Sequence, residues 1–494
     1  MRAFRPALAS LLVVAGCGDG AGDGPAASTC EALLVAPVLP SPRLTVDGAH
    51  LRDALGRDVL LRGVNAGGRA KLPPFFAFPF AESGLASQRG APPFDDAVAA
   101  YLDRVAAWGH DVIRLPFTWE AVEPTRGAYD DAFLERYAAV AAAAGARGLR
   151  VIVDMHQDVF ARPYCGDGFP LWATSHPDAA PPDDCTQWFR GYTDDERVRA
   201  DLGRFWRDDD GLMTAFVAMW RRVAARLWEV DGVVAFEILN EPAAGDLDES
   251  TWARDVLAPF YARLADEIRA VAPGAPVLVD ATGFEAVIAE TALPRPDTDG
   301  VVFAPHYYDP LALLSGVAPE DGDAMTPLGR WRAVGDDWQA PVLVGELGIR
   351  PAAEGAAAWV RANFDALDAH RLHATLWEYS ATADDWNDEA MSVVDGEGRE
   401  LATAAELVRA YPLAVAGDLL AWSFDRGTLA GTLRVDAAPG GVTEVRTPTR
   451  LYPRGVVATV TAGDACAAPT ADGERLLVAS PTGGPVTLEL APAP

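Results

Sequence analysis

The sequence predicts an α/β chain in which a (β/α)8 barrel, the TIM barrel fold, is followed by a small antiparallel β-sandwich. Between residues 58 and 412, eight short β-rich apolar runs alternate with stretches in which apolar residues recur every three or four positions. The runs are apolar throughout, as expected for parallel strands covered on both faces. Eight such units favour a closed barrel over an open, doubly wound sheet. Over residues 418–494 the runs are short, alternating and separated by Gly, Pro and Asp, which indicates the sandwich.

The predicted strands follow one another at intervals typical of strand–helix units. They are VLLRGVN (59–65), DVIRLPF (111–117), LRVIVDM (149–155), GVVAFEILN (232–240), APVLVDA (275–281), GVVFAPH (300–306), APVLVGEL (340–347) and LHATLWEY (372–379). Helical periodicity is clear over residues 94–109 and 131–148. Chemistry in a barrel of this kind is expected at the carboxyl ends of the strands.

The first residues indicate export. Residues 1–16 contain two arginines and an apolar run too short to cross a bilayer, as in a signal peptide. The ending VAGC resembles a bacterial lipobox, in which Cys17 would be lipidated; ordinary signal cleavage is the alternative. The Gly- and Asp-rich residues 17–29 suit a flexible tether, and residues 30–57 suit a lead-in packed against the barrel. We expect a membrane-anchored lipoprotein or a secreted protein.

Four further cysteines are present: Cys30, Cys165, Cys185 and Cys466. An even number in an exported chain predicts two disulfides, for which three pairings exist. Cys165 and Cys185 bracket one long loop, which favours their pairing and leaves Cys30 for Cys466. The absence of a CxxC pair or of a histidine close to a cysteine argues against a metal site, and we expect no cofactor.

Charge excludes some partners. The net charge is −30 with a pI near 4.5, which argues against nucleic acid and against an anionic surface recognised through charge.

Of the 41 basic residues only Lys71 is a lysine. Chance in an arginine-biased chain is one explanation, and a site that needs a compact ammonium is the other. We expect a monomer.

Two strand ends carry glutamates. Asn240 and Glu241 follow the fourth strand in FEILNEP, and Glu346 ends the seventh in VLVGELG. A pair of carboxylates flanking a bond is what glycoside hydrolysis requires, one as acid and the other as nucleophile or base. Two unrelated surface glutamates are the alternative.

These motifs resemble the retaining β-glycosidases of glycoside hydrolase family 5, over residues 58–412. The eight positions of the family pattern are filled by Arg114, His156, Asn240, Glu241, His306, Tyr308, Glu346 and Trp377. The resemblance implies that Glu241 is the acid/base and that Glu346 is the nucleophile, held ionised by its neighbours. It further implies that Asn240 binds the sugar 2-OH, that His306 either donates to Glu241 or positions it, and that Trp377 lies beneath the sugar ring. Retention requires the two carboxyl groups to lie roughly 5–5.5 Å apart.

Further stretches resemble endoglycoceramidases and related glycosphingolipid hydrolases, which cut the bond between a glycan's reducing glucose and ceramide. They are DMHQD (154–158), residues 377–395 and residues 408–417. This resemblance implies sugar contacts from His156, Asp158 and Lys71, and therefore a function for the lone lysine. A tryptophan beside the sugar corresponds to Trp188 or to Trp172.

A lipid substrate also needs an apolar surface on the catalytic face of the barrel. Two loops are apolar, PPFFAFPF (73–80) and DPLALLSGV (309–317). Their large side chains are Phe75, Phe76, Phe78, Phe80, Leu311, Leu313 and Leu314. They either line a groove for the two ceramide chains or pack the loops down.

The leading expectation is an endoglycoceramidase-like retaining β-glycosidase acting on glycosphingolipids. One alternative is a β-glucosidase acting on glucosylceramide or a steryl glucoside. Another is an endo-β-glucanase or mannanase, against which the apolar loops argue. A non-catalytic glycan-binding lipoprotein is the last, and the presence of both glutamates argues against it.

Overall fold

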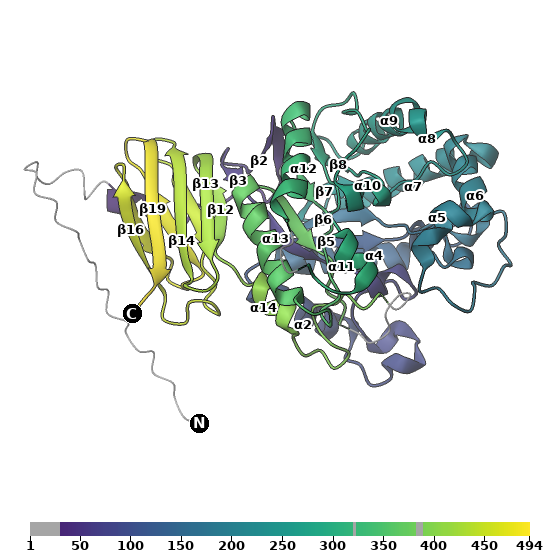
Figure 1. Ribbon diagram of the computed structural model, residues 1–494, viewed down its shortest axis with the longest axis horizontal. Helices are drawn as coiled ribbons and strands as arrows, with labels where there is room; N and C mark the ends of the chain where they lie inside the picture. Colours follow the sequence, from purple (N-terminus) through teal and green to yellow (C-terminus); the bar gives the residue numbers. More distant parts are fainter. Residues whose placement is uncertain (1–29, 320–322, 382–388) are drawn as a thin grey trace, which may run out of the picture.

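The computed structural model describes residues 30–319, 323–381 and 389–494. The predicted signal peptide (1–16), Cys17 and the tether (17–29) lie outside the described residues. Figure 1 shows two parts side by side, a barrel and a stack of antiparallel strands that includes the C-terminus. In the described ranges, none of the helices has the length and apolar character needed to cross a membrane.

The barrel is formed by all eight predicted strands, running parallel. They are β4 (Arg62–Asn65), β5 (Val112–Phe117), β6 (Arg150–Met155), β7 (Val233–Glu237), β8 (Val277–Val279), β9 (Val301–Phe303), β10 (Leu343–Val344) and β11 (His373–Leu376). The paired order is β10-β11-β4-β5-β6-β7-β8-β9. A parallel bridge between Phe303 and Val342 closes the ring. Every residue of these strands is buried, which explains their continuous apolar character.

Helices surround the barrel (Figure 1). The α-helices are α2 (Phe94–Ala107), α3 (Trp119–Val122), α4 (Asp131–Gly145), α5 (Gly191–Asp194), α6 (Glu196–Trp206), α7 (Leu212–Leu227), α8 (Glu249–Trp252), α9 (Ala258–Arg269), α10 (Gly283–Ile288), α11 (Pro310–Ser315), α12 (Met325–Trp338), α13 (Ala356–His370) and α14 (Ala402–Leu407). Helix α4 shows how the sequence specifies them. The Asp130 side chain accepts the Phe133 N–H at 2.9 Å and caps the helix start. Phe133, Leu134 and Tyr137 then recur on one buried face.

The amino-terminal end of the barrel is filled with apolar side chains. The inward residues there come from six strands or strand starts and are Val112, Ile152, Val234, Leu278, Val302 and Leu343. Leu44 and Leu51 from the lead-in pack beneath them and are 2% and 3% exposed. The lead-in therefore closes the floor of the barrel.

The second part is a pair of antiparallel sheets. Its strands are β1 (Thr45–Asp47), β2 (His50–Arg52), β3 (Asp58–Val59), β12 (Tyr411–Val415), β13 (Gly417–Asp425), β14 (Ala430–Ala437), β15 (Val442–Arg446), β16 (Val456–Ala462), β17 (Cys466–Pro469), β18 (Arg475–Ala479) and β19 (Gly484–Pro492). One sheet has the order β1-β2-β3-β12-β15-β18-β17 and the other β13-β14-β19-β16.

The larger sheet of the sandwich takes strands from both sides of the barrel sequence. In the structure, β3 pairs antiparallel with β12, so the lead-in and the segment that crosses the expected barrel end at residue 412 both belong to this sheet. Four of the five β12 residues are buried, and Ala414 joins the floor of the barrel, so the strand has the apolar character of a barrel strand.

Both favoured disulfides are present. Cys30 is bonded to Cys466, which ties the start of the lead-in to β17, and Cys165 is bonded to Cys185. The second bond restrains the long loop that follows β6.

Candidate active site

Charged side chains converge where the barrel strands end, opposite the apolar floor. Arg114 lies within β5, His156 and Asp158 follow β6, Glu241 follows β7 and Glu346 follows β10. A cavity of about 790 Å³ opens over them. It is lined at one side by Lys71, Asp158, Trp188, Glu241, Tyr308 and Glu346.

Arg114 organises the floor of this cavity. Its guanidinium is fully buried and donates to both carboxylate oxygens of Glu237, at 2.7 and 2.8 Å. It also donates to Glu346 Oε1 at 2.7 Å and to Asn240 Oδ1 at 2.9 Å. The planar guanidinium thus orients the side chains of Glu237, Glu346 and Asn240 at once, which the single ammonium of a lysine could not do in the same way.

Glu346 is held as a carboxylate. Besides Arg114, the Tyr308 hydroxyl donates to its Oε2 at 2.7 Å. Burial would raise its pKa, but the charges of His306 and Arg114 outweigh burial and hold the pKa at about 2. An ionised carboxylate at this position fits the nucleophile that the family resemblance implies.

Glu241 faces Glu346 across the cavity. The His306 Nδ1 lies 2.8 Å from Glu241 Oε1, and an oxygen of Glu241 lies within 4.8 Å of one of Glu346. This spacing is that of retaining glycosidases, because an inverting pair leaves roughly 6.5–9.5 Å for a water molecule.

Lys71 lies in the short helix Gly68–Lys71 after β4 and is buried. Its ammonium donates to Asp158 Oδ2 at 2.5 Å and lies 4.5 Å from the centre of the Trp377 ring. Burial opposes the charge, but Asp158 and Glu389 raise the pKa of Lys71. The His156 ring stacks on the same tryptophan: its centre lies 5.3 Å from that of the Trp377 ring, and the two rings are nearly parallel. The loop position therefore places the lone lysine among the predicted sugar-binding residues.

The two candidate tryptophans differ in position. Trp188 lines the cavity, with the Lys71 ammonium 5.8 Å from its ring centre. Trp172 instead donates to the backbone oxygen of Glu123 and packs edge-on against Trp119. Trp188 follows the Cys165–Cys185 bond closely in the chain, so the disulfide restrains the segment that presents it.

Of the two expectations for the phenylalanine loop, the structure has the second: its rings pack the loop down and do not line the cavity. Phe76, Phe78 and Phe80 are at most 3% exposed, and Phe75 is half-buried against Phe133. The rings pack on one another and on α2 at centroid distances of 5.1–6.3 Å. These aromatic side chains form a local core, because several large rings in one loop bury more apolar area together than they would in a wet groove.

The other apolar loop is only partly as predicted. Leu313 lines the cavity and is 45% exposed, and Leu311 on the same helix α11 is 61% exposed. The Leu314 side chain lies outside the described part of the structure. Most of the apolar wall comes from residues that the sequence did not single out: Trp252, Leu257, Phe284, Ile349 and Met391.

Several acidic residues of the site were not identified from the sequence, among them Asp154, Glu237 and Glu389. Asp154 lies 2.7 Å from His156 Nδ1, Glu237 pairs with Arg114, and Glu389 lines the cavity 3.8 Å from the Lys71 ammonium. Burial raises the pKa of Glu389 to about 7, against the lowering effect of Lys71. The first two stand in the motifs DMHQD and FEILNEP, at spacing that points their side chains to the barrel interior, and this signal could have found them.

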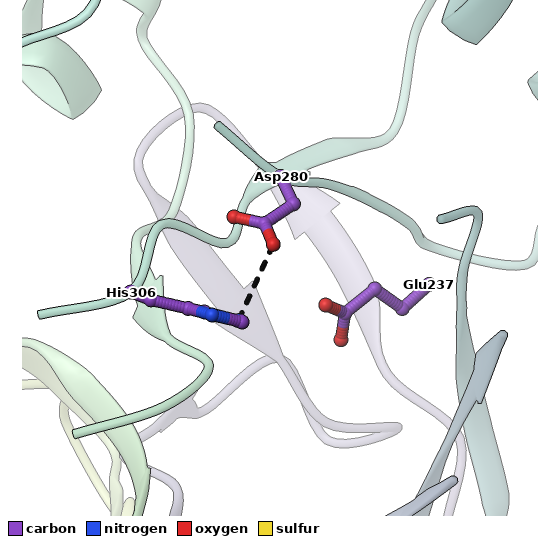
Figure 2. A group of neighbouring side chains, drawn as sticks. All are labelled: Glu237, Asp280 and His306. Carbon is purple, nitrogen blue, oxygen red and sulfur yellow. Dashed lines mark ion pairs between the residues drawn. The ribbon is translucent and has the colours of Figure 1, made fainter. Parts of the chain in front are cut away.

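Among the described residues, two clusters have the donor types of a metal site; one joins His306 to Glu241 and Glu346, and the other lies beside it. Glu237, Asp280 and His306 each present an atom within 4.8 Å of the others, and Figure 2 shows the Asp280–His306 pair beside Glu237. Arg114 already donates to both oxygens of Glu237, and its positive charge opposes a cation at that place. The cluster is therefore better explained as a network of protein charges.

Comparison with known proteins agrees with this geometry. The family model described as Cellulase (glycosyl hydrolase family 5) matches residues 78–383, and that of the glycoside hydrolase family 5 C-terminal domain matches residues 409–488. Endoglycoceramidase I of Rhodococcus hoagii is 27% identical over 92% of this chain and 89% of its own length. A glucosylceramidase of Aspergillus fumigatus is 36% identical over 26% of this chain and 18% of its own length.

Solved structures give the same picture. The structure of endo-glycoceramidase II from Rhodococcus sp. in complex with ganglioside GM3 superposes with a TM-score of 0.73 at 25% identity. The superposition covers 91% of this chain and 100% of that one, so it includes the barrel and the sandwich together.

Proposed function

Because the chain belongs to glycosyl hydrolase family 5, we propose that it is a retaining β-glycosidase that cuts between the reducing sugar and the ceramide of glycosphingolipids. One observation carries the proposal. A single cavity joins a polar end, with the paired Glu241 and Glu346, to an apolar wall that includes Phe284 and Leu313. A substrate with a sugar head and a lipid tail matches both ends. The endoglycoceramidase relatives support it.

The geometry supports a double displacement. Glu346 attacks the anomeric carbon as a carboxylate, while Glu241 gives its proton to the leaving oxygen of ceramide. This forms a covalent glycosyl-enzyme. Glu241 then takes a proton from water, which attacks the same carbon and releases the glycan while Glu346 leaves. Separation of the two carboxylates by less than 5 Å at their nearest oxygens leaves room for a sugar carbon but no separate water between them.

The polar end supplies hydrogen bonds to sugar hydroxyls. The Asn240 amide is fixed by Arg114 at its oxygen and by the Gln157 backbone oxygen, 3.1 Å from its nitrogen. In this proposal its second N–H donates to the sugar 2-OH, a contact that strengthens in the transition state. Lys71 and Asp158 form a buried donor–acceptor pair, which can bind neighbouring hydroxyls of the next part of the glycan.

The apolar wall supports a lipid aglycone. Phe284 on α10 is 74% exposed and Leu313 on α11 is 45% exposed, and both face the same cavity. Apolar side chains gathered in one exposed cavity mark a surface that binds an apolar ligand. The proposal includes a lipid anchor, because the lipobox-like sequence ends at Cys17. Lipidated Cys17 would hold the enzyme at the membrane that contains its substrate.

Product analysis tests the proposal. The protein is incubated with a panel of glycosphingolipids, and the released species are identified by mass spectrometry. Intact oligosaccharide with free ceramide is the expected result, and Glu346→Gln should release neither. Stepwise monosaccharide release, or cleavage of glucosylceramide alone, would overturn the endo mode in favour of a glucosylceramidase, for which the short match to the Aspergillus fumigatus enzyme speaks.

A further inference from the structure

We propose that Asp280 is a positioning residue of this site, which holds the backbone of Glu241 and fixes the charge of His306. The inference rests on the proposed function in one respect, because it takes Glu241 as acid/base and Glu346 as nucleophile. Asp280 follows β8 and is 1% exposed. It is not among the eight family positions identified in the sequence.

The first contact is to the backbone of Glu241. The backbone φ of Glu241 is +39°, a conformation that residues other than glycine rarely adopt and that persists only where neighbouring groups hold it. Asp280 Oδ2 accepts the Glu241 N–H at 2.9 Å. The carboxylate thus anchors the amide of the residue whose side chain must meet the leaving oxygen.

The second contact is to His306, as Figure 2 shows. Asp280 Oδ2 lies 3.3 Å from Nε2, while Nδ1 lies 2.8 Å from Glu241 Oε1 and 3.5 Å from Glu346 Oε2. Glu237 on β7 also presents an atom within 4.8 Å of one on the ring, and Arg114 donates to both Glu237 and Glu346. The groups in direct contact with the two ring nitrogens are carboxylates, which favour a positively charged imidazole.

The charges form a chain from Asp280 to the nucleophile. Burial opposes charge on His306, but Asp280, ahead of Glu346 and Glu241, raises the pKa of His306 to about 10. Burial also raises the pKa of Asp280 itself. Both its oxygens accept backbone N–H groups, from Glu241 and Ala281, which favours the carboxylate and thereby the charged imidazole paired with it. The imidazolium in turn lowers the pKa of Glu346.

The direct test reads the charge of His306 without relying on activity. In the full-length protein labelled with ¹⁵N-histidine, both ring nitrogens of His306 should be protonated at about pH 7.5. Asp280→Asn keeps the size and an oxygen for the Glu241 amide but removes the charge, so one ring nitrogen should lose its proton. His306→Gln assigns the resonance. A ring that stays doubly protonated in Asp280→Asn overturns the inference.

Kinetics tests the consequence for catalysis. With an aryl β-glycoside, the acidic limb of kcat/KM should move to higher pH by about one unit in Asp280→Asn, because Glu346 loses a stabilising cation. Asp280→Ala also frees the Glu241 amide. Its kcat on glycolipid should fall about 100-fold, and its kcat/KM on a dinitrophenyl glycoside, whose leaving group needs no proton, by less than about tenfold.

A matched control separates positioning from general damage. The Tyr261 hydroxyl donates to the backbone oxygen of Asp280 at 3.0 Å, so Tyr261→Phe disturbs the same backbone and leaves the carboxylate in place. We expect its pH profile and its ratio of the two substrates to be those of wild type. Equal losses on both substrates in Asp280→Ala, with an unmoved acidic limb in Asp280→Asn, would mean that Asp280 is merely structural. A wild-type enzyme inactive on every glycoside would overturn the proposed function instead, while the histidine measurement would still decide the charge of His306.

Discussion

The two ends of the barrel share the same strands and have opposite chemistry. At the amino-terminal end Val112, Ile152 and Val234 meet Leu44 and Leu51 in an apolar floor. At the carboxyl end β5 and β7, two of the strands that supply that floor, present Arg114 and Glu237 to a cluster of buried charges. Burying charges costs free energy that their mutual attraction only partly offsets. The floor must therefore supply the stability on which the charged end depends, and variants at the two ends should affect different properties.

The acid/base position gives the largest expected effect. Glu241→Gln should lower kcat on glycolipid by about 10³-fold, because the leaving oxygen no longer receives a proton. With a dinitrophenyl glycoside, kcat/KM should change little, while a burst of dinitrophenol shows that the second step has become slow. The thermal midpoint should not fall. A wild-type profile on glycolipid would refute the assignment.

The floor gives the largest expected effect on stability. Leu51→Ala should lower the free energy of unfolding by about 3 kcal/mol, since it opens a cavity beneath the barrel. Urea denaturation followed by circular dichroism measures this change. For the comparison to hold, kcat/KM of the folded fraction should equal that of wild type; a tenfold loss of kcat/KM would show that the two ends are coupled.

Lys71→Arg tests whether the charged end needs a compact ammonium. The planar guanidinium cannot fit between Asp158 and the Trp377 ring as the ammonium does, so glycolipid hydrolysis should slow by 10- to about 100-fold. Initial rates together with the thermal midpoint separate this effect from unfolding. Arg399→Lys, at an exposed ion pair, serves as the conservative control and should behave as wild type. Unchanged activity in Lys71→Arg would mean that the site does not need an ammonium and that the lone lysine is a chance occurrence in an arginine-biased chain.

The smallest expected effect lies at the rim of the cavity. Phe284→Ser should weaken kcat/KM on glycolipid about fivefold, by removing part of the apolar contact with the lipid, and leave a soluble aryl glycoside unaffected. Phe78→Ser is the contrasting variant, since Phe78 is buried in the loop core. It should lower the thermal midpoint and affect both substrates equally. A loss confined to glycolipid in Phe78→Ser, with equal losses on both substrates in Phe284→Ser, would show that the phenylalanine loop binds the lipid.

The sequence allowed the barrel and the paired glutamates to be predicted because both depend on local signals. A continuous apolar run ends in Asn240 and Glu241, and another contains Glu346. The pairing of β3 with β12 could not be predicted in this way, because β3 is short and its partner lies at the far end of the barrel sequence. Its pairing depends on the finished fold.

The same distinction holds within the site. Phe76 and Phe284 are both apolar residues near strand ends, and only the packing of neighbouring rings shows that one is core and the other is rim. Asp280 and Glu346 each stand one residue before the end of a predicted strand. The partner of Asp280, His306, comes from the next strand, so their contact is a property of the finished barrel.

The pairing of β3 with β12 also sets an order of events during synthesis. Residues 45–59 leave the ribosome first, but β12 becomes available only after every strand of the barrel has been made. Contacts between distant parts of a chain form late, since a long loop must close before they are gained. Until then the lead-in lacks its partner in the larger sheet, and the floor consists of the barrel's own side chains, such as Val112 and Ile152. A chain that stops before residue 411 would thus lose more than its sandwich: the lead-in would lack the strand that holds it beneath the barrel.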